Sequence, residues 1–364
     1  MSLTDLESRL LTQIKAQPFA TQKELGEAVG ISRASVANYV ERLQNKGLIL
    51  GRAYVFAQVP GVTCIGGTVL DRILRMTSDA IPHTSQPGTS SSTRGGVGRN
   101  VAENLAQLGE PVKLMSVIGA DEAGRQIVEA TEGAGVDVSL VERLPHGITG
   151  TYTAVMQPSG ELYLGIADMG IMDELNEQII DGNWQHIVSS RLVFAETNCH
   201  PSLLANLIKR CKNADIPLAV DAVSIPKFKR LPDALDGVTY LFCNKDEAQS
   251  VCDDDDLEAL ARYLQFRGAK NVVITSGEGP IGCLAGDQFT LIETPRTKII
   301  DVSGAGDAFV AGVIHGILQE LELNEAAKLG VVAAGLTVQC ELRNSPDLTA
   351  AALSEGAKSI KIKG

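Results

Sequence analysis

The sequence predicts an α/β protein with a doubly wound, mostly parallel sheet and a small β lid, preceded by a small winged helix-turn-helix domain. Three observations lead to this prediction. From residue 192 onward, short apolar runs alternate with segments of helical periodicity, the pattern of repeated β–α units. Residues 151–156 and 161–166 alternate in polarity around Pro158-Ser159-Gly160, which is typical of a β-hairpin. Residues 1–56 hold three short helical patterns and then an alternating apolar segment.

Length and composition are those of a globular protein with one large and one small domain: 364 residues, of which 44% are hydrophobic. No apolar run approaches the ~20 residues that span a membrane. The N-terminus is a charged amphipathic segment and does not resemble a signal peptide. We therefore expect a cytoplasmic protein without membrane contact. The seven cysteines are scattered and include no Cys-x-x-Cys pair, which indicates reduced thiols and no zinc site.

Charge is divided unevenly along the chain. The net charge is −12, which argues against binding of nucleic acid by the whole chain. Residues 1–56, however, carry seven Lys and Arg against five Asp and Glu, a balance of +2 that leaves −14 for the remainder. This asymmetry indicates two parts with different partners.

The N-terminal helices carry clear start and stop signals. Thr21 and Glu24 have the spacing of a capping box that opens the second helix, after a first helix over residues 5–16. Gly30 closes the second helix, and Ser32 caps a third. The alternating segment at residues 48–56 then predicts a two-stranded wing.

This order of elements resembles the N-terminal DNA-binding modules of many bacterial regulators. The resemblance implies that the third helix enters the major groove and exposes Arg33, Ser35, Asn38, Tyr39 and Arg42, while Arg52 of the wing faces phosphate. Arg33 and Arg42 are the foremost candidates. The alternative is a small helical domain used for dimerisation or packing.

The expected linker is Val59-Pro60-Gly61, which divides the chain into residues 1–58 and 61–364. The second part begins with a short buried strand. Polar or hairpin-forming segments around 84–96 and 150–166 are expected to form a small sheet that stands off the main body as a lid.

Polar side chains follow the expected strands at their carboxyl ends, where ligands bind in open parallel sheets. Asp71 comes just after the first buried strand, where it suits bidentate contact with vicinal hydroxyls or is a surface-loop residue. The other polar side chains at such strand ends are Asn100, Asn244, Thr275 and Asp307.

A glycine-rich turn at residues 301–312 runs into an apolar helix, and residues 298–300 before it read as the end of a buried strand. Unpaired amides at a helix N-terminus suit an anion, and we expect a phosphate. Asp307 at the same helix start would accept a proton from an attacking hydroxyl. The alternative is an ordinary N-cap made by Ser303 or Asp307. The turn matches neither a Walker A loop nor a dinucleotide fingerprint.

A second glycine-rich loop, within residues 95–109, also opens a helix. Together with residues 301–314 it resembles the two signatures of the ribokinase-like (PfkB) family of carbohydrate and nucleoside kinases. The resemblance covers about residues 61–364, and Asn244-Lys245-Asp246-Glu247 matches the Asn-x-x-Glu element of that family.

The resemblance implies a ribokinase-like fold and a role for each matching residue. Asp307 would be the base for a 5′-hydroxyl, and an anion hole is implied for the amides of Gly304, Ala305 and Gly306. The residues implied to hold the acceptor are Asp71, Gly95, Gly96 and Asn100. Those implied to contact ATP are Asn244, Thr275, Gly277, Gly304 and Gly306, with Glu247 reaching Mg²⁺ through water.

Other assignments are less direct. Asp301 and Ser303 lie where many members of the family bind a monovalent cation such as K⁺. Pro280 departs from the family, which often has glycine there. Thr151 and Asp168 on the expected lid hairpin are candidates for base recognition, or ordinary polar residues at a strand edge.

Residues 167–171 and 220–227 resemble the pseudouridine kinase branch, some members of which carry an N-terminal helix-turn-helix. We therefore expect a homodimeric kinase that uses ATP and Mg²⁺ to phosphorylate the 5′-hydroxyl of a nucleoside, pseudouridine by preference. One alternative is a kinase for another ribonucleoside or a sugar. The other is a ligand-sensing transcriptional regulator with a kinase-like domain, against which the intact residues 304–307 argue.

Overall fold

The structure, a computed structural model, describes residues 3–17, 20–49, 61–81, 83–340 and 342–363. The chain divides into two compact units, Met1–Ala57 and Gln58–Gly364. Within the described ranges, no helix is both long enough and apolar enough to cross a membrane.

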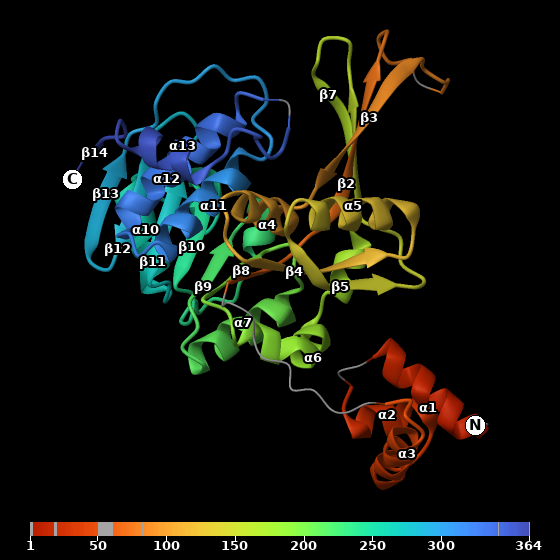
Figure 1. The fold of residues 1–364 in the computed structure, drawn as a ribbon. Helices are drawn as coiled ribbons and strands as arrows, with labels where there is room; N and C mark the ends of the chain where they lie inside the picture. The colour runs from red at the N-terminus through yellow and green to blue at the C-terminus, as the bar shows by residue number, and fades with distance from the viewer. Residues whose placement is uncertain (1–2, 18–19, 50–60, 82, 341, 364) are drawn as a thin grey trace. The chain divides into compact units, whose positions relative to one another are not determined.

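The first unit consists of three helices around a small apolar core (Figure 1). The helices are α1 (Asp5–Ala16), α2 (Gln22–Val29) and α3 (Arg33–Asn45). The expected capping box at Thr21 and Glu24 is present, Gly30 ends α2 with a φ of 75°, and Ser32 caps α3. The core consists of Leu10, Leu25, Val29, Val36, Val40 and Leu43. The expected wing is described only up to residue 49, and Arg52 lies outside the described residues.

The second unit is built on a ten-stranded sheet with the order β14-β13-β12-β11-β10-β9-β8-β1-β4-β5. The adjacent strands β11, β10, β9, β8, β1, β4 and β5 run parallel to one another. Strands β12, β13 and β14 are antiparallel additions at the β11 edge. The strands are β1 (Val62–Ile65), β4 (Val112–Gly119), β5 (Asp137–Leu144), β8 (Leu192–Glu196), β9 (Leu218–Asp221), β10 (Tyr240–Asn244), β11 (Asn271–Thr275), β12 (Ile281–Ala285), β13 (Gln288–Ile292) and β14 (Ile362–Lys363).

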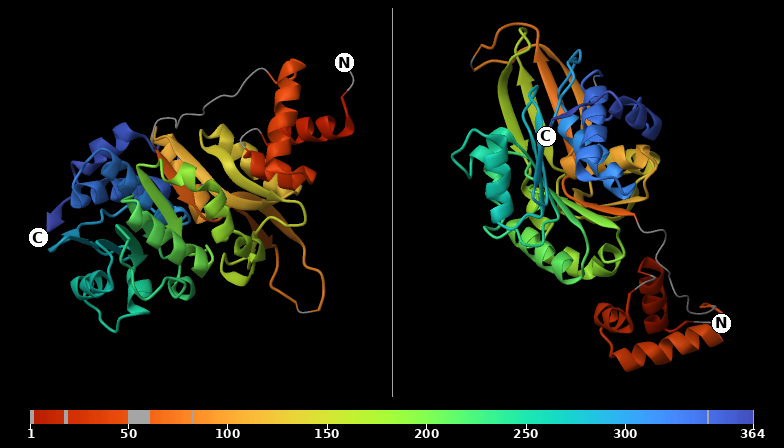
Figure 2. Two further views of the ribbon diagram at one scale, coloured as in Figure 1. Left: turned by 90° about the horizontal axis from the view of Figure 1, so that it is seen from below. Right: turned by 90° about the vertical axis from the view of Figure 1, so that its left-hand side faces the viewer.

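Helices lie on both faces of this sheet, as Figure 2 shows. They are α4 (Val97–Gln107), α5 (Glu122–Gly133), α6 (Glu177–Ile187), α7 (Pro201–Asn213), α8 (Ile225–Phe228), α9 (Lys245–Gln249), α10 (Leu257–Phe266), α11 (Ala305–Leu318), α12 (Leu323–Thr337) and α13 (Ala350–Ala357), with a 3₁₀ turn at Gly170–Glu174. Alternate side chains of β8 divide between two cores. Val193 and Ala195 join α6, α7 and α10, whereas Leu192 and Phe194 join α4, α11 and α12. The predicted doubly wound fold is confirmed.

A separate four-stranded sheet, the lid, has the order β3-β2-β6-β7 and stands off the main body (Figure 1). Its strands are β2 (Val69–Met76), β3 (Gly88–Gly95), β6 (Thr151–Met156) and β7 (Leu162–Asp168). The segments predicted to form the lid contain β3, β6 and β7, whereas β2 is a lid strand that the sequence did not predict. Asp71 therefore lies inside a lid strand and not in a loop after a strand end.

The strand predicted at residues 298–300 is wrong. This segment has no regular secondary structure, and Ile299 and Ile300 are 48% and 51% exposed. The Ile300 amide instead donates to the carbonyl of Val338, which follows α12. Two adjacent isoleucines indicate a buried strand only where a neighbouring strand pairs with the segment. Among the described residues, no strand pairs with residues 298–300.

Candidate active site

The N-terminus of α11 is shaped by a glycine. Gly304 precedes the helix with a φ of 81°, which only glycine adopts without strain, and no side chain caps the helix. A Cβ atom on Gly304 would lie 2.5 Å from the Arg343 carbonyl oxygen. The backbone here therefore requires glycine on two independent grounds. The first amides of α11 have no intrahelical acceptors, and although that of Ala305 donates to the Val302 carbonyl at 3.3 Å, the helix start can bind an anion.

Asp307 lies in the first turn of α11 and is joined to α4 across the site. Its Oδ2 accepts a hydrogen bond of 2.6 Å from Asn100 Nδ2. Burial raises the pKa of the Asp307 carboxyl to about 7, and the nearby carboxylate of Glu196 acts in the same direction. The hydrogen bond from Asn100 and the charges of Arg343 and Arg99 oppose this rise. A carboxyl with this pKa can accept and release a proton near neutrality.

The loop between β3 and α4 brings glycines against other backbone segments. A Cβ atom on Gly95 would fall on the Asp71 carboxyl group, 2.7 Å from its Cγ. Gly96 has a φ of 101°, and a Cβ atom there would lie 2.6 Å from the carbonyl carbon of Gly67. This close packing explains the glycines and places Asp71 of β2 beside the start of α4. Asp71, Gly95, Gly96 and Asn100 thus lie at one end of α4.

Two charged residues of this region were not singled out by the sequence analysis. Arg343 Nη2 donates to Asp71 Oδ2 at 3.1 Å, from a segment that carries no recognisable motif. Glu196, fully buried at the end of β8, accepts the Gly67 amide at 2.6 Å, and burial raises its pKa. The position of Glu196 at a strand end was the one signal that could have identified it.

A cavity of about 160 Å³ opens beside Asp307 at the carboxyl ends of the central strands. It is lined by residues that include Asp221, Asn244, Glu247, Thr275 and Gly306. Asn244 and Thr275 are neighbours in the β10–β11 pairing. Burial raises the pKa of both Asp221 and Glu247, and for Asp221 the charge of Glu247 adds to this. Carboxyl groups that repel one another beside one cavity favour a cation there.

Asn244 and Glu247 form a reciprocal capping box at the start of α9. The Asn244 side chain accepts from the Glu247 amide, and Glu247 Oε2 accepts from the Asn244 amide, each at 2.8 Å. The Asn-x-x-Glu element therefore holds the helix together and also turns both side chains toward the cavity. Gly277 follows β11 in a turn, with a φ of 60°.

Asp301 and Ser303 lie in the segment that leads into α11. Asp301 Oδ1 accepts the Ser303 amide at 2.8 Å. Burial alone would raise the pKa of Asp301. The hydrogen bonds from Ser303 and the charges of Arg343 and Arg75 outweigh burial, so this pKa is lowered. Across the described residues, no cluster of three or more His, Cys, Asp and Glu side chains is arranged to hold a metal ion.

The lid residues proposed for base recognition are not brought together with Asp71. Thr151 pairs with Leu70 of β2 and with Asp168 of β7. Because side chains alternate between the faces of a strand, Thr151 and Asp168 lie on the lid face opposite Asp71. Tyr152, the pairing partner of Asp71 on β6, lies on the same face as Asp71.

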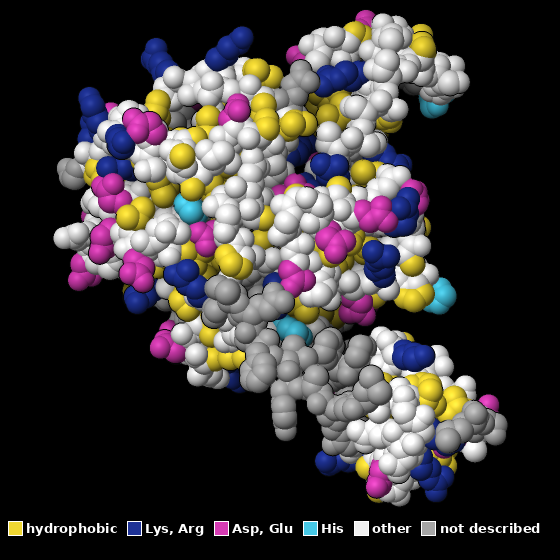
Figure 3. Space-filling model, in the orientation of Figure 1, with side chains coloured by type: hydrophobic (Ala, Val, Ile, Leu, Met, Phe, Trp, Pro, Cys, Tyr) yellow, Lys and Arg dark blue, Asp and Glu magenta, His cyan; other side chains and the backbone are white. Residues whose placement is uncertain are grey.

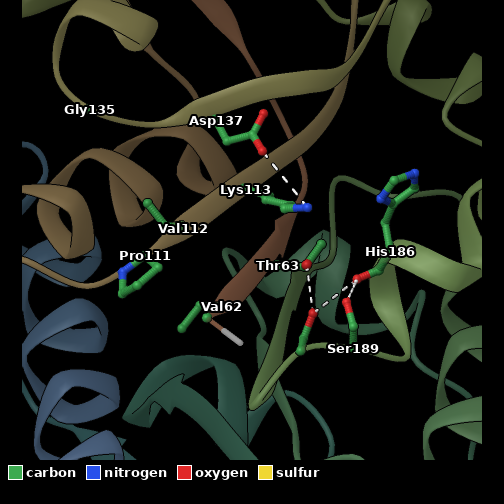
Figure 4. Close-up of a pocket in the computed structure, with 11 residues that line it drawn as sticks. Val62, Thr63, Pro111, Val112, Lys113, Gly135, Asp137, His186 and Ser189 are labelled. Carbon is green, nitrogen blue, oxygen red and sulfur yellow. Dashed lines mark hydrogen bonds and ion pairs between the residues drawn. The ribbon is translucent and has the colours of Figure 1, made fainter. Parts of the chain in front are cut away.

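A second cavity, of about 200 Å³, lies at the opposite ends of the strands of the main sheet, their amino ends (Figure 4). It is lined at the amino ends of β1, β4 and β5 by Thr63, Lys113 and Asp137, and by His186 at the end of α6. Lys113 and Asp137 form an ion pair of 3.8 Å. This cavity lies away from Asp307, and ligands of open α/β sheets bind at the carboxyl ends of the strands. The Asp307 site is therefore the candidate for the chemistry.

The arrangement around Asp307 suits one class of reaction. Asp307, a base with a pKa near neutrality, lies beside the uncapped amides of α11. The Asp71 carboxylate of the lid lies on one side of it, and the cavity bordered by Asp221 and Glu247 lies on the other. A hydroxyl group held by Asp71 could lose its proton to Asp307 while the amides of α11 neutralise a transferring phosphoryl group.

Comparisons with known proteins agree with this chemistry. Residues 60–350 match the model of the pfkB family carbohydrate kinases, and residues 3–49 match that of a winged helix-turn-helix DNA-binding domain. The uncharacterized sugar kinase YeiI of Escherichia coli K12 is 29% identical over 356 residues, which cover 96% of this chain and 97% of that protein.

Other relatives are named for nucleosides. The pseudouridine kinase of Escherichia coli K12 is 28% identical and the guanosine-inosine kinase of Exiguobacterium acetylicum is 29% identical. Their matches cover 73% and 72% of this chain, and 87% and 89% of those proteins. A solved carbohydrate kinase from Agrobacterium tumefaciens superposes with a TM-score of 0.75 at 26% identity, covering 84% of this chain and all of that one. The chain belongs to the pfkB family of carbohydrate kinases, which transfer a phosphoryl group to a hydroxyl acceptor.

Proposed function

We propose that this protein is an ATP-dependent kinase that phosphorylates the 5′-hydroxyl of a nucleoside, with pseudouridine as the preferred acceptor. The observation that carries the proposal is Asp307: a carboxyl with a pKa of about 7, at an uncapped helix N-terminus, bonded to Asn100. A general base works best when its pKa lies near the working pH. The amides of Gly304, Ala305 and Gly306 form the anion hole in this proposal.

Two observations support a nucleoside acceptor. Two relatives are named as nucleoside kinases, one of them for pseudouridine. The Asp71 carboxylate next to Gly95 and Gly96 offers two oxygens to a pair of vicinal hydroxyls such as those of ribose. Another ribonucleoside, or a sugar as in the relative YeiI, is the alternative acceptor.

The cavity beside Asp307 fits ATP and Mg²⁺. Asn244, Thr275, Gly277 and the glycines of the α11 turn would border the nucleotide. Glu247 and Asp221 are carboxyl groups held in a buried, mutually repelling arrangement that a cation would relieve. Mg²⁺ commonly keeps several waters, so Glu247 would hold it through water. When bound, the ion neutralises phosphate charge. Asp301, whose lowered pKa leaves it ionised well below neutral pH, would hold K⁺ together with Ser303.

The direct test is Asp307→Asn, assayed by ADP release and by detection of the phosphorylated product. The acceptor panel is pseudouridine, uridine, guanosine, inosine and D-ribose. We expect loss of about 10²–10⁴-fold in kcat for the best acceptor, the range for removal of a general base. A variant as active as wild type would refute the base assignment. Absence of turnover by wild type on the whole panel would favour a ligand-sensing regulator over a kinase.

We also propose a homodimer formed through the lid. The pairing register places Leu74, Val155, Leu164 and Ile166 on the lid face opposite Asp71. Leu74, Leu164 and Ile166 are 38%, 49% and 54% exposed, and Figure 3 shows hydrophobic side chains on the lid. A second copy of the chain would cover this apolar strip. Light scattering of wild type and Leu164→Glu measures the predicted loss of the dimer.

DNA binding by the first unit is a second proposed function, favoured by the match of residues 3–49 to a DNA-binding model. Arg33, Asn38 and Arg42 are exposed on α3, whereas Val36 and Val40 face the core of that unit. Ser35 is half-buried, and its Oγ lies 2.8 Å from that of Ser32. Tyr39 is half-buried as well, with the Arg42 guanidinium 5.3 Å from its ring centre. The exposed polar side of α3 is the surface that would enter a major groove.

A further inference from the structure

Arg99, in the first turns of α4, is 1% exposed and every part of its guanidinium is engaged. Nε donates to the Gly95 carbonyl at 3.1 Å, and Nη2 donates to the Arg94 carbonyl at 3.2 Å. Nη1 donates to Glu103 one turn along the helix, and Nη2 also donates to Asn100 Oδ1 at 2.7 Å. The guanidinium therefore joins the last two residues of lid strand β3 to the side chain that contacts Asp307.

This arrangement decides which way the Asn100 amide points. A guanidinium has only donors, so the group of Asn100 that faces Arg99 must be the carbonyl oxygen. The amide nitrogen then faces the other way, where it donates to Asp307 Oδ2 at 2.6 Å. A rotated amide would place its oxygen against the carboxylate, where two acceptors repel each other. Donation to the carboxylate favours the ionised form of Asp307, which is the form that can act as a base.

We propose that Arg99 is a positioning residue for phosphoryl transfer: it locks the Asn100 amide in the orientation that donates to Asp307 and fastens the end of lid strand β3 to α4. The proposal rests on the proposed function of Asp307 as the base. Arg99 does not touch the reacting groups in this scheme; it acts through Asn100 and through the backbone of Gly95, against which the Asp71 carboxyl lies.

A stabilising role alone accounts poorly for these contacts. A buried ion pair is weak support for stability, because taking both charges out of water offsets most of their attraction. The pair with Glu103, which also accepts from Thr131 at 3.3 Å, uses only one edge of the guanidinium. The remaining donors go to Asn100 and to the end of β3. The planar fork thus meets four acceptors in fixed directions, which a lysine ammonium cannot reproduce.

The charged groups around Asp307 set the background for a test by pH. Glu196 on β8 and Asp221 on β9 face it with negative charge, and Arg343 of the C-terminal segment and Arg99 of α4 face it with positive charge. Replacing Arg99 by lysine keeps the positive charge. A change in the pH profile of that variant therefore reports the lost hydrogen-bond geometry and not the lost charge.

The experiment compares kcat and KM of Arg99→Lys with wild type from pH 5.5 to 9 on the best acceptor of the panel. We expect kcat/KM at pH 7 to fall about tenfold to a hundredfold, the range for loss of a hydrogen bond to a charged group. We also expect the acid limb of the profile to move upward by about 1 pH unit, since Asp307 loses an oriented donor. An acid limb at the wild-type pH would overturn the proposal.

Two further variants keep the test decisive. In the double variant Arg99→Met with Glu103→Leu, no buried charge is left unpaired, so the protein folds even if Arg99→Lys does not. Its acid limb should move upward at least as far, because the charge of Arg99 is lost together with the hydrogen-bond geometry, and a wild-type profile would count against positioning. The matched control is Arg125→Lys, because Arg125 makes the same i,i+4 pair with Glu129 on the surface of α5. Its profile should equal that of wild type.

The Asp307→Asn variant separates the two levels of inference. If Asp307→Asn is inactive while both Arg99 variants keep the wild-type acid limb, the base assignment stands and the positioning role is refuted. If Asp307→Asn is fully active, the base assignment fails and the positioning role fails with it. A purely structural Arg99 would lower the thermal unfolding midpoint and leave the acid limb where it is.

Discussion

Arg343 Nη2 lies 3.1 Å from Asp71 Oδ2, and this ion pair joins a lid strand to a segment 272 residues further along the chain. Both side chains are largely buried, at 21% and 13% exposure. The backbone of Arg343 also packs against Gly304 at the start of α11. One residue of the C-terminal segment therefore borders both the proposed acceptor carboxylate and the proposed anion hole.

Replacing Arg343 with alanine should impair acceptor binding. Burial raises the pKa of Asp71, and the charge of Arg343 lowers this pKa. Removing Arg343 therefore raises the pKa of Asp71 further and weakens its carboxylate as an acceptor of hydrogen bonds from the hydroxyl groups of the substrate. The loss corresponds to about 1–3 kcal/mol, or roughly tenfold to a hundredfold in the KM of the acceptor. Steady-state kinetics with each substrate varied in turn measure this. Arg343→Lys, which keeps the charge, should recover part of the loss. A change confined to the KM of ATP would contradict the acceptor role.

Asp307→Asn should be more stable than wild type at high pH. The folded-state pKa of about 7 lies above the ordinary value, so the folded protein holds a proton that the unfolded chain releases near pH 4. Stability then falls as pH rises from about 4 to 7, because the unfolded state binds fewer protons. The amide variant avoids this loss, and we expect a gain of about 2–4 kcal/mol at pH 8.5 and almost none at pH 4.5.

Thermal unfolding midpoints at the two pH values check this prediction, with Asp301→Asn as a control of opposite sign. The pKa of Asp301 is lowered, so its ionised form stabilises the folded state above the unfolded pKa, and that contribution is lost as pH falls through the folded value. Asp301→Asn should therefore be less stable than wild type at pH 8.5. Equal midpoints for wild type and Asp307→Asn at both pH values would show that Asp307 is not held in a destabilised ionised state.

The two glycine loops could be predicted because their cause is local. A positive φ or a close backbone approach requires glycine wherever it occurs, so Gly96 and Gly304 mark the site in the sequence itself. Arg343 and Glu196 could not be predicted in this way. Their roles depend on which distant backbone segment lies next to them, and apart from the position of Glu196 at a strand end, nothing in their own sequence neighbourhoods records this.

Strand prediction failed where burial was the deciding factor. β2 reads Val-Leu-Asp-Arg-Ile-Leu-Arg-Met and lacks strict alternation, because the lid has partly covered side chains on both of its faces. At residues 298–300 a strand was predicted where none exists, because the two isoleucines that suggested a buried strand are exposed. The role of Thr151 and Asp168 in base recognition stays a prediction; one residue of register decides the face of a strand, and their register places them on the lid face opposite Asp71.

Alanine at Gly304 and alanine at Gly306 should behave differently. At Gly304 the Cβ atom meets the Arg343 backbone and φ is positive, so we expect a loss of stability of at least about 1–3 kcal/mol and loss of activity. At Gly306 nothing lies within 4 Å of a Cβ atom, so Gly306→Ala should fold normally. Because Gly306 lines the cavity, its new methyl group should weaken ATP binding. Denaturant unfolding measures the stability of each variant, and steady-state kinetics measure its KM for ATP. A Gly304→Ala variant that is stable and active would contradict the strained turn.

Glu247→Gln should change the Mg²⁺ requirement without disturbing α9. Glutamine keeps an oxygen that can accept the Asn244 amide, so the capping box survives. Loss of the charge should raise the Mg²⁺ concentration needed for half-maximal rate by about tenfold to a hundredfold. Magnesium titrations of initial rate, with chelator added to remove trace metal, give this value. Asp246→Asn makes the same chemical change at an exposed neighbour and should leave the titration unchanged. An unaltered titration for Glu247→Gln would remove Glu247 from the cation site.

Replacing Arg33 and Arg42 together with alanine should abolish specific DNA binding by the full chain. Both are exposed on α3, and residues 58–364 carry most of the negative charge, so little non-specific attraction to DNA remains to compensate for their loss.

Duplexes selected by wild type from a random pool serve as the probe, with binding followed by fluorescence anisotropy across a salt series. If both arginines contact phosphates, the slope of log affinity against log salt should fall in size by about two; if they contact bases, preference for the selected duplex should vanish first. Lys15→Ala, an exposed charge at the end of α1, is the control for net charge. Affinity of the double variant equal to that of wild type would leave α3 without a role in DNA recognition.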